Sequence, residues 1–275
     1  LDCSSKNCNS SLSNSNKKGD CFMLKDGITE IIQKYDIDAG VIVKHGDQIM
    51  YQHQAEKIFP AGSLIDLAIA AYIEDQWKKI PEVVDEKMEV TDLSRVRGAG
   101  IIGDLRRTNW SVRDLVYLTS ALLDNVATNL LIEKFDIYEI DEWLKQNYPG
   151  IRLGRELMRY SANGQDNECT AISIDKLITH LMTTQNLFCA LVRKGLSNHI
   201  IPTDLTFYGD NLLTYNKLGR DRQARHEVCA FMTKKAPVFC TVLSSYEGRN
   251  IEDRLFFQEL SKLIFSHVKS ADFEK

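Results

Sequence analysis

Several features are absent from this sequence, and each absence excludes a class of protein. No apolar run approaches the roughly 20 residues that a transmembrane helix needs, so we predict no transmembrane segment. The net charge is −4, and we expect no nucleic-acid binding because that function normally leaves a basic surface. No signal peptide precedes the numbering. The chain is therefore predicted to be soluble, or to be the mature part of an exported protein.

The cysteines follow neither of the common cysteine patterns. They stand at positions 3, 8, 21, 169, 189, 229 and 240, and no CxxC or HExxH sequence occurs. Because these spacings fit neither a small disulfide framework nor a zinc site, we predict no metal and no cofactor. The last four lie in apolar or mixed stretches, where buried free thiols are expected. Cys229 and Cys240 flank a predicted turn at residues 234–237 and could face each other, but cross-strand pairs often fail disulfide geometry.

A polar leader opens the chain. Residues 1–21 are mainly Ser, Asn and Lys, which cannot bury enough apolar surface to order themselves, so a flexible segment is predicted. A cysteine followed by such a tether is typical of exported bacterial lipoproteins. Asp2 is unfavourable directly before a lipidated Cys3, so lipidation stays one interpretation. We expect an extracytoplasmic location, with a cytoplasmic one left open.

From residue 22 onward, apolar periodicity predicts a mixed fold. The predicted helices share helical apolar spacing and span residues 24–35, 63–77, 111–135, 137–146, 172–184 and 254–268. The predicted strands are residues 39–43, 48–52, 227–233 and 238–244. Strands from both ends of the chain can join one antiparallel sheet, so the predicted class is α+β. We predict one domain over residues 22–275, with an α/β lobe (22–58 and 190–275) and a mostly helical middle lobe (59–189).

The first motif is the segment FPAGSLID at residues 59–66. It resembles class A β-lactamases and penicillin-binding proteins, which carry Ser-x-x-Lys at the start of a buried helix. In this resemblance Ser63 takes the place of the nucleophile and Asp66 takes the place of the lysine. A spacing of three puts both side chains on one helix face. Taken alone, Ser63 could instead be a helix cap, which is a common role for serine.

Two further motifs strengthen the resemblance. The segment LDN at residues 123–125 resembles Ser-Asp-Asn, with Leu123 in place of the serine. The resemblance implies that Asn125 binds the substrate amide and the active-site lysine; the alternative is an ordinary polar turn. The segment KLG at residues 217–219 resembles Lys-Thr-Gly. Lys217 and Gly219 are retained, whereas Leu218 replaces the threonine that helps to recognise a substrate carboxylate. The resemblance covers residues 23–268 and implies a β-lactamase-like fold.

The resemblance implies that the substituted motif positions include groups that transfer protons in the family. A serine hydroxyl is a weak nucleophile until a neighbouring base accepts its proton. A carboxylate with an ordinary pKa of about 4 is a weak base at neutral pH, so Asp66 cannot copy a neutral lysine. The resemblance places the two motif lysines side by side, which predicts an Asp66–Lys217 ion pair. We expect pairing to lower the pKa of Asp66 and to raise that of Lys217, so that each becomes a poorer base.

Deacylation in class A β-lactamases also needs a glutamate in the loop between the second and third motifs. Residues 150–170 offer Glu156 and Glu168. The segment RLGREL at residues 152–157 only loosely resembles the family's Arg-x-Glu-x-x-Leu-Asn. Glu156 is therefore interpreted chiefly as a solvated helix charge, with deacylation as the alternative.

Two functions stay open at this point. The first is a divergent serine hydrolase or acyltransferase that uses Ser63 on a small amide, ester or peptide-like substrate. Asn125, Lys217, Gly219 and Leu218 would then line the substrate site. The second is an inactive relative that binds a peptide, a cell-wall fragment or a small amide; a pure interaction module is less favoured. In neither case do we expect efficient hydrolysis of ordinary penicillins.

Overall fold

The computed structural model describes residues 24–161, 164–200, 203–209, 212–221, 224–245 and 250–273. The predicted leader at residues 1–21 lies outside these ranges. Across the described residues, none of the helices combines the length and apolar character needed to cross a bilayer.

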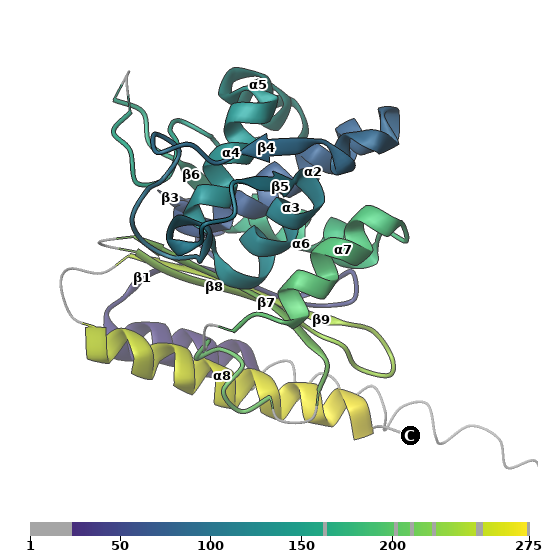
Figure 1. Cartoon of the computed structure of the whole chain (residues 1–275). Helices are drawn as coiled ribbons and strands as arrows, with labels where there is room; N and C mark the ends of the chain where they lie inside the picture. The colour runs from purple at the N-terminus through teal and green to yellow at the C-terminus, as the bar shows by residue number, and fades with distance from the viewer. Residues whose placement is uncertain are drawn as a thin grey trace, which may run out of the picture.

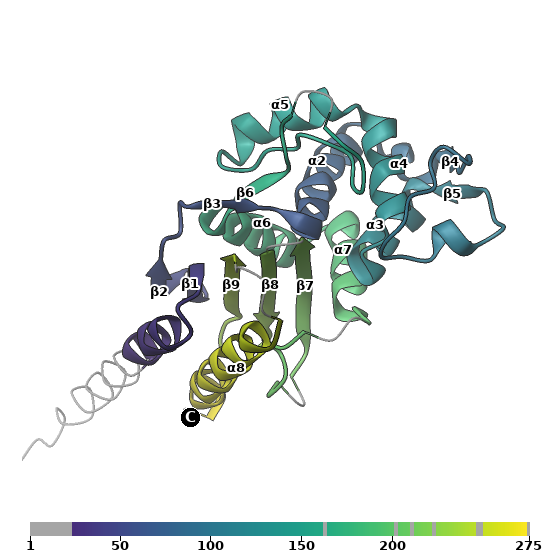
Figure 2. The same ribbon diagram turned by 90° about the vertical axis from the view of Figure 1, so that its left-hand side faces the viewer.

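One antiparallel sheet joins the two ends of the chain (Figure 2). Its strands lie in the order β2-β1-β9-β8-β7. They are β1 (Asp38–His45), β2 (Gln48–His53), β7 (Thr214–Asp221), β8 (Ala224–Phe231) and β9 (Val238–Ser245). The pairing of Val41 with Val242 places the first strand beside the last. The α+β prediction is confirmed, and β7 is left as an edge strand of this sheet.

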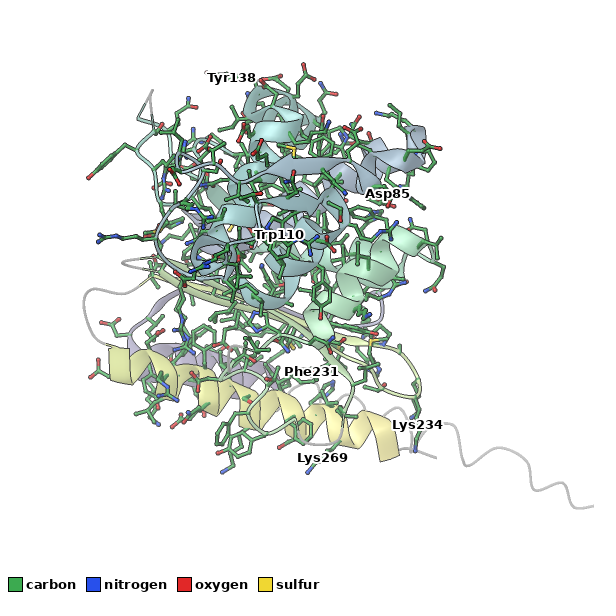
Figure 3. The ribbon with its side chains drawn as sticks, in the orientation of Figure 1. Asp85, Trp110, Tyr138, Phe231, Lys234 and Lys269 are labelled. Atoms are coloured by element: carbon green, nitrogen blue, oxygen red, sulfur yellow. The ribbon has the colours of Figure 1, made fainter. Side chains whose placement is uncertain are left out.

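Helices cover both faces of the sheet (Figure 1). The helix over residues 24–35 and α8 (Asn250–Phe273) lie side by side on one face, and the helical lobe covers the other. Every residue of β8 is buried, as expected for a strand covered on both sides. Figure 3 shows Phe231 between the sheet and α8, where it belongs to one of two apolar clusters. The other cluster fills the space between the sheet and the helical lobe.

The helical lobe is built around one buried helix. Its helices are α2 (Ile65–Lys79), α3 (Val112–Leu122), α4 (Asn125–Phe135), α5 (Ile137–Asn147), α6 (Ala171–Thr183) and α7 (Leu187–Ser197). Its short elements are β3 (Ile58–Pro60), η1 (Gly62–Leu64), η2 (Pro81–Asp85), β4 (Lys87–Glu89), η3 (Ile102–Asp104), β5 (Asn109–Ser111) and β6 (Glu168–Thr170). Ten successive residues of α2, from Ile65 to Glu74, are buried. Asp66 and Glu74, the two carboxylates in this stretch, therefore lie in the interior of the protein.

Local capping explains where the structure departs from the predicted elements. The single helix predicted over residues 111–135 is two helices, because Leu123 adopts a left-handed conformation with φ of +55°. Asp124 then caps α4 by accepting from the backbone N–H of Ala127 at 3.0 Å. The helix predicted from Ser63 begins as the 3-10 turn η1 before α2. Apolar spacing did not predict α7 or the two small ladders β3–β6 and β4–β5.

The cysteines of the described residues are free thiols. Cys229 lies directly opposite Cys240 in the β8–β9 pairing, as the predicted turn implied. Both are buried and unbridged. Burial raises the pKa of Cys229 well above its ordinary value, so this thiol stays protonated.

Candidate functional site

Ser63 lies where an edge strand and the buried helix meet. It is half-buried on η1, directly before α2. Gly62 has φ of +50°, and a Cβ added there would lie 2.8 Å from the backbone oxygen of Arg220, so η1 packs closely on β7. Neither η1 nor α2 uses a side-chain cap, and within the described ranges the Ser63 hydroxyl has no hydrogen-bond partner. The cap interpretation is therefore wrong, and this hydroxyl is available for chemistry.

Asp66 and Lys217 meet in a fully enclosed ion pair. Their Oδ2 and Nζ atoms are 2.6 Å apart, and the side chains are 2% and 0% exposed. Thr128 Oγ1 donates to the other carboxylate oxygen of Asp66 at 2.8 Å. Lys217 Nζ also donates to the backbone oxygen of Thr119 at 2.5 Å. Both charged groups are therefore occupied by partners inside the protein.

The pKa shifts of this pair oppose the sequence-based expectation. Burial raises the pKa of Asp66, and its contacts with Lys217 and Thr128 offset this only in part. Burial likewise lowers the pKa of Lys217 despite the attraction of Asp66. The expectation was wrong because removing both groups from water disfavours each charge more than pairing favours it. Each group still has the other as its nearest proton partner, so neither is a free base for Ser63.

The polar turn of the second motif holds a glycine-rich loop against α4. Asn125 Nδ2 donates to the backbone oxygen of Arg97 at 3.2 Å. Asp124 Oδ2 accepts from the backbone N–H groups of residues 101 and 102, at 2.6 and 2.9 Å. A Cβ added to Gly98 would lie 2.3 Å from Asn125 Nδ2, so only glycine permits this approach. The motif therefore links α3 to α4 and fixes the glycine-rich loop at residues 97–102.

The replaced motif positions are apolar and buried. Leu123 and Leu218 are 4% and 1% exposed and carry no polar side-chain atom. They supply neither the relay hydroxyl nor the carboxylate-binding hydroxyl that the resemblance assigns to these places. Gly219 permits close packing, because a Cβ there would lie 2.7 Å from Leu64 Cγ and 3.1 Å from the backbone oxygen of Ala61.

His226 positions the segment that leads to Ser63. Its Nδ1 accepts from the backbone N–H of Ser244 at 3.1 Å, which leaves the proton on Nε2. That nitrogen donates to the backbone oxygen of Pro60 at 2.5 Å. Burial lowers the pKa of His226 to about 4, so the ring is neutral near pH 7. The sequence analysis predicted a strand from residue 227 and assigned no role to His226.

Both candidate deacylation carboxylates are paired with arginines. Glu156 lies in a loop, not in a helix as interpreted, and contacts Arg159 at 2.8 Å. Glu156 also lines a surface cavity of about 300 Å³ between α5 and this loop. Glu168 contacts Arg152 at 2.6 Å. Each carboxylate is therefore held by an arginine of the same region.

A leucine of the same loop is held by α4. Arg155 Nε contacts Asp166 Oδ1 at 2.7 Å and closes the loop on itself. If Arg155 is aligned with the arginine of Arg-x-Glu, Leu157 takes the place of the glutamate. Asn129 holds Leu157 on both sides, accepting from its N–H at 2.8 Å and donating to its oxygen at 3.0 Å. The loose match at residues 152–157 did not single out Leu157.

Similarity to known proteins agrees with this geometry. The profile of the Beta-lactamase enzyme family matches residues 23–268, the range that the motifs predicted. A β-lactamase from Sphaerobacter thermophilus is similar, at 17% identity and a TM-score of 0.78, over 89% of this chain and 98% of that one. A class A β-lactamase from Mycobacterium abscessus gives 16% identity and a TM-score of 0.77, over 89% and 98%.

A β-lactamase from Burkholderia vietnamiensis gives 16% identity and a TM-score of 0.78, over 92% of this chain and 97% of that one. Identities this low show a shared fold and do not carry over an activity. No curated protein matches the sequence. The family match spans most of the chain. The chain belongs to the Beta-lactamase enzyme family.

Proposed function

We propose that this chain is a divergent serine hydrolase or acyltransferase whose Ser63 accepts an acyl group from a small amide, ester or peptide-like substrate and releases it slowly. One observation carries the proposal. The Ser63 hydroxyl is half-buried at the start of a buried helix and, in the described part of the chain, forms no hydrogen bond that would tie it to a structural role.

The backbone around Ser63 supports acylation. The N–H of Ser63 lies in the first turn of η1, where a helix leaves its N–H groups without helical partners. An N–H group so placed can stabilise the oxyanion of a tetrahedral intermediate, and one such donor is worth about 10²–10³ in rate. Ser63 Oγ bonds the carbonyl carbon, the C–N or C–O bond breaks, and the serine proton leaves with the amine or alcohol.

The proton-transfer groups favour slow chemistry. A positioned general base contributes about 10²–10⁴ to such reactions. Asp66 and Lys217 are occupied with each other, and Leu123 has no relay hydroxyl. Leu157, held by Asn129, offers no carboxylate for the attack of water on an acylated serine. We therefore expect an acyl group that persists, and not the turnover implied by the names of similar solved structures.

Intact-protein mass spectrometry tests the proposal. The full chain is incubated with a reporter penicillin and with a panel of activated esters. We expect at least one reagent to add its acyl mass, and Ser63→Ala to abolish the addition. Ser197→Ala, which alters an exposed serine at the end of α7, is the matched control and should be labelled like the parent chain. An adduct that survives Ser63→Ala would refute the role of Ser63.

One observation favours a second function, binding without chemistry. The resemblance assigns Lys217 and Asn125 to the substrate, but Lys217 Nζ and Asn125 Nδ2 both donate to partners within the protein. In this case no reagent forms an adduct. A small amide, peptide or cell-wall fragment then raises the melting temperature of the parent chain and of Ser63→Ala equally.

A further inference from the structure

A second polar cluster lies in the helical lobe, further along α2 than Asp66. It joins Glu74 of α2, His180 of α6 and Cys189 of α7. Their donor atoms all lie within 4.8 Å of one another. Glu74 and Cys189 are buried, whereas the His180 side chain is 31% exposed. The three side chains therefore bring three possible metal ligands together, and His180 connects the cluster to solvent.

Neighbouring residues fix the orientation of these three groups. Asn186 accepts from the backbone N–H of Cys189 and donates to Glu74 Oε1, both at 2.7 Å. Thr184 Oγ1 lies 3.3 Å from His180 Nδ1, which leaves Nε2 directed at Glu74, 2.7 Å away. Partners of this kind around ligand side chains are the usual surroundings of a metal site.

The Glu74 carboxylate has three partners within the protein. His180 Nε2 and Asn186 Nδ2 each lie 2.7 Å from one of its oxygens. Binding of a metal ion would replace the proton of the buried Cys189 thiol. Lys78 also contacts Glu74 at 2.7 Å, but its side chain is 48% exposed and can turn into water.

We infer that Glu74, His180 and Cys189 form a binding site for a zinc-like divalent metal ion. Carboxylate oxygen, imidazole nitrogen and thiolate sulfur are all zinc ligands, and three of them leave a fourth position for water. Tetrahedral bonds of about 2.0–2.3 Å place such donors roughly 3.3–3.8 Å apart, within the spread of this cluster. On binding, the Cys189 thiol gives its proton to solvent as the S–metal bond forms, and His180 binds through Nε2 with its proton on Nδ1.

The sequence predicted no metal site because these ligands follow no short motif. Glu74 and His180 are 106 positions apart, and Glu74 and its supporting Asn186 are 112 apart. Only the packing of α2 against α6 and α7 brings them together. The absence of CxxC and HExxH motifs excludes only zinc sites built from nearby residues, and it does not bear on ligands from three separate helices.

Cobalt(II) spectroscopy on the reduced, metal-free full chain tests the inference. We expect visible bands of tetrahedral cobalt and a thiolate-to-cobalt band in the near ultraviolet. Cys189→Ala should abolish the thiolate band. The triple variant Cys3→Ser, Cys8→Ser and Cys21→Ser is the matched control and should keep it. Loss of the band in that triple variant, together with its survival in Cys189→Ala, would assign the metal to the leader and overturn the inference.

Thermal unfolding with zinc(II) gives a second readout that needs no sulfur ligand. Zinc should raise the melting temperature of the parent chain and should not raise that of His180→Ala. Lys78→Gln should bind zinc more tightly, because it removes a cation that competes for Glu74. Thr184→Val should weaken zinc binding by about 10-fold, because it removes the hydroxyl that orients the His180 ring. No thiolate band and no zinc effect on the parent chain would contradict the site.

Discussion

Two carboxylates on the same helix meet opposite surroundings. Asp66 and Glu74 both lie on the buried part of α2, about two turns apart. Asp66 is closed in by Lys217 and Thr128, which come from β7 and α4. Glu74 faces Lys78 and other side chains that reach solvent. Both side chains are 2% exposed, but the partners of Asp66 are buried with it, whereas Lys78 and His180 beside Glu74 reach solvent.

The pKa directions follow from this difference. Burial dominates at Asp66 and raises its pKa, whereas hydrogen bonds dominate at Glu74 and lower its pKa. Asp66 has two hydrogen-bonding side-chain partners and Glu74 has three. The additional partner and the weaker enclosure both favour the charged form of Glu74. The enclosed Asp66–Lys217 pair leaves neither group available to accept a proton, which fits the slow proton transfer proposed at Ser63. An open cluster keeps its groups available, which fits a metal site.

The largest expected effect comes from breaking the sealed pair. Lys217→Met leaves the carboxylate of Asp66 buried without its cation and should lower the free energy of unfolding by about 3–5 kcal/mol. The double variant Asp66→Leu with Lys217→Met should recover most of that loss, because two apolar groups need no partner. Urea denaturation measures both. A double variant as unstable as the single would show that Lys217 stabilises the fold by means other than the pair.

Rebuilding the motifs should convert the sealed pair into a reactive one. Asp66→Lys, Leu123→Ser and Leu218→Thr together restore the missing amine and hydroxyl groups. We expect the rate of labelling by a reporter penicillin to rise by about 10²-fold, the lower end of general-base contributions. Time-resolved intact mass measures it. A triple variant that folds but is not labelled would show that the motifs are assigned to the wrong residues.

Adding Leu157→Glu to that triple variant should introduce turnover. The new carboxylate would stand on the loop that Asn129 holds, and it would supply the base that acyl release lacks. The measurement is steady-state release of product after the first equivalent. Glu156→Gln in the same background is the control, and it should not change turnover because Glu156 is paired with Arg159.

A smaller effect is expected in the pH dependence of stability, to which Glu74 contributes. The folded-state pKa of Glu74 lies below its ordinary value of 4.5, so the unfolded chain binds the proton more readily. Its contribution to stability is therefore present above pH 4.5 and is lost as the pH falls through the folded-state pKa. Glu74→Gln should flatten the fall in unfolding free energy on acidification. An unchanged slope would contradict the assignment.

The smallest effect is expected where a pair is exposed. Lys79 contacts Asp75 at 2.7 Å on the outer side of α2, with side chains 60% and 32% exposed. Lys79→Met should change the free energy of unfolding by only about 0.3–0.5 kcal/mol, as measured by urea denaturation. It is the matched control for Lys217→Met, and an effect of similar size in both would remove the contrast between sealed and open pairs.

How far the sequence predicts the molecule depends on the range of the interactions involved. The apolar spacing of residues 65–74 and the turn at residues 234–237 are local, and both predicted their elements. Motif order correctly brought Asp66 to Lys217. Their pKa directions depend on how completely α3, α4 and β7 enclose them, and no local pattern encodes that. The cluster at Glu74 depends on packing between helices that are far apart in the sequence, so no local pattern could predict it.

The lifetime of the acyl group on Ser63 tests most directly whether the sealed Asp66–Lys217 pair has replaced the proton relay. The chain is acylated by an activated ester, excess reagent is removed, and the adduct mass is followed at neutral pH. We predict release no faster than from the same acylated protein after denaturation. Release far faster from the folded chain would show that a working base reaches Ser63 and would contradict the account.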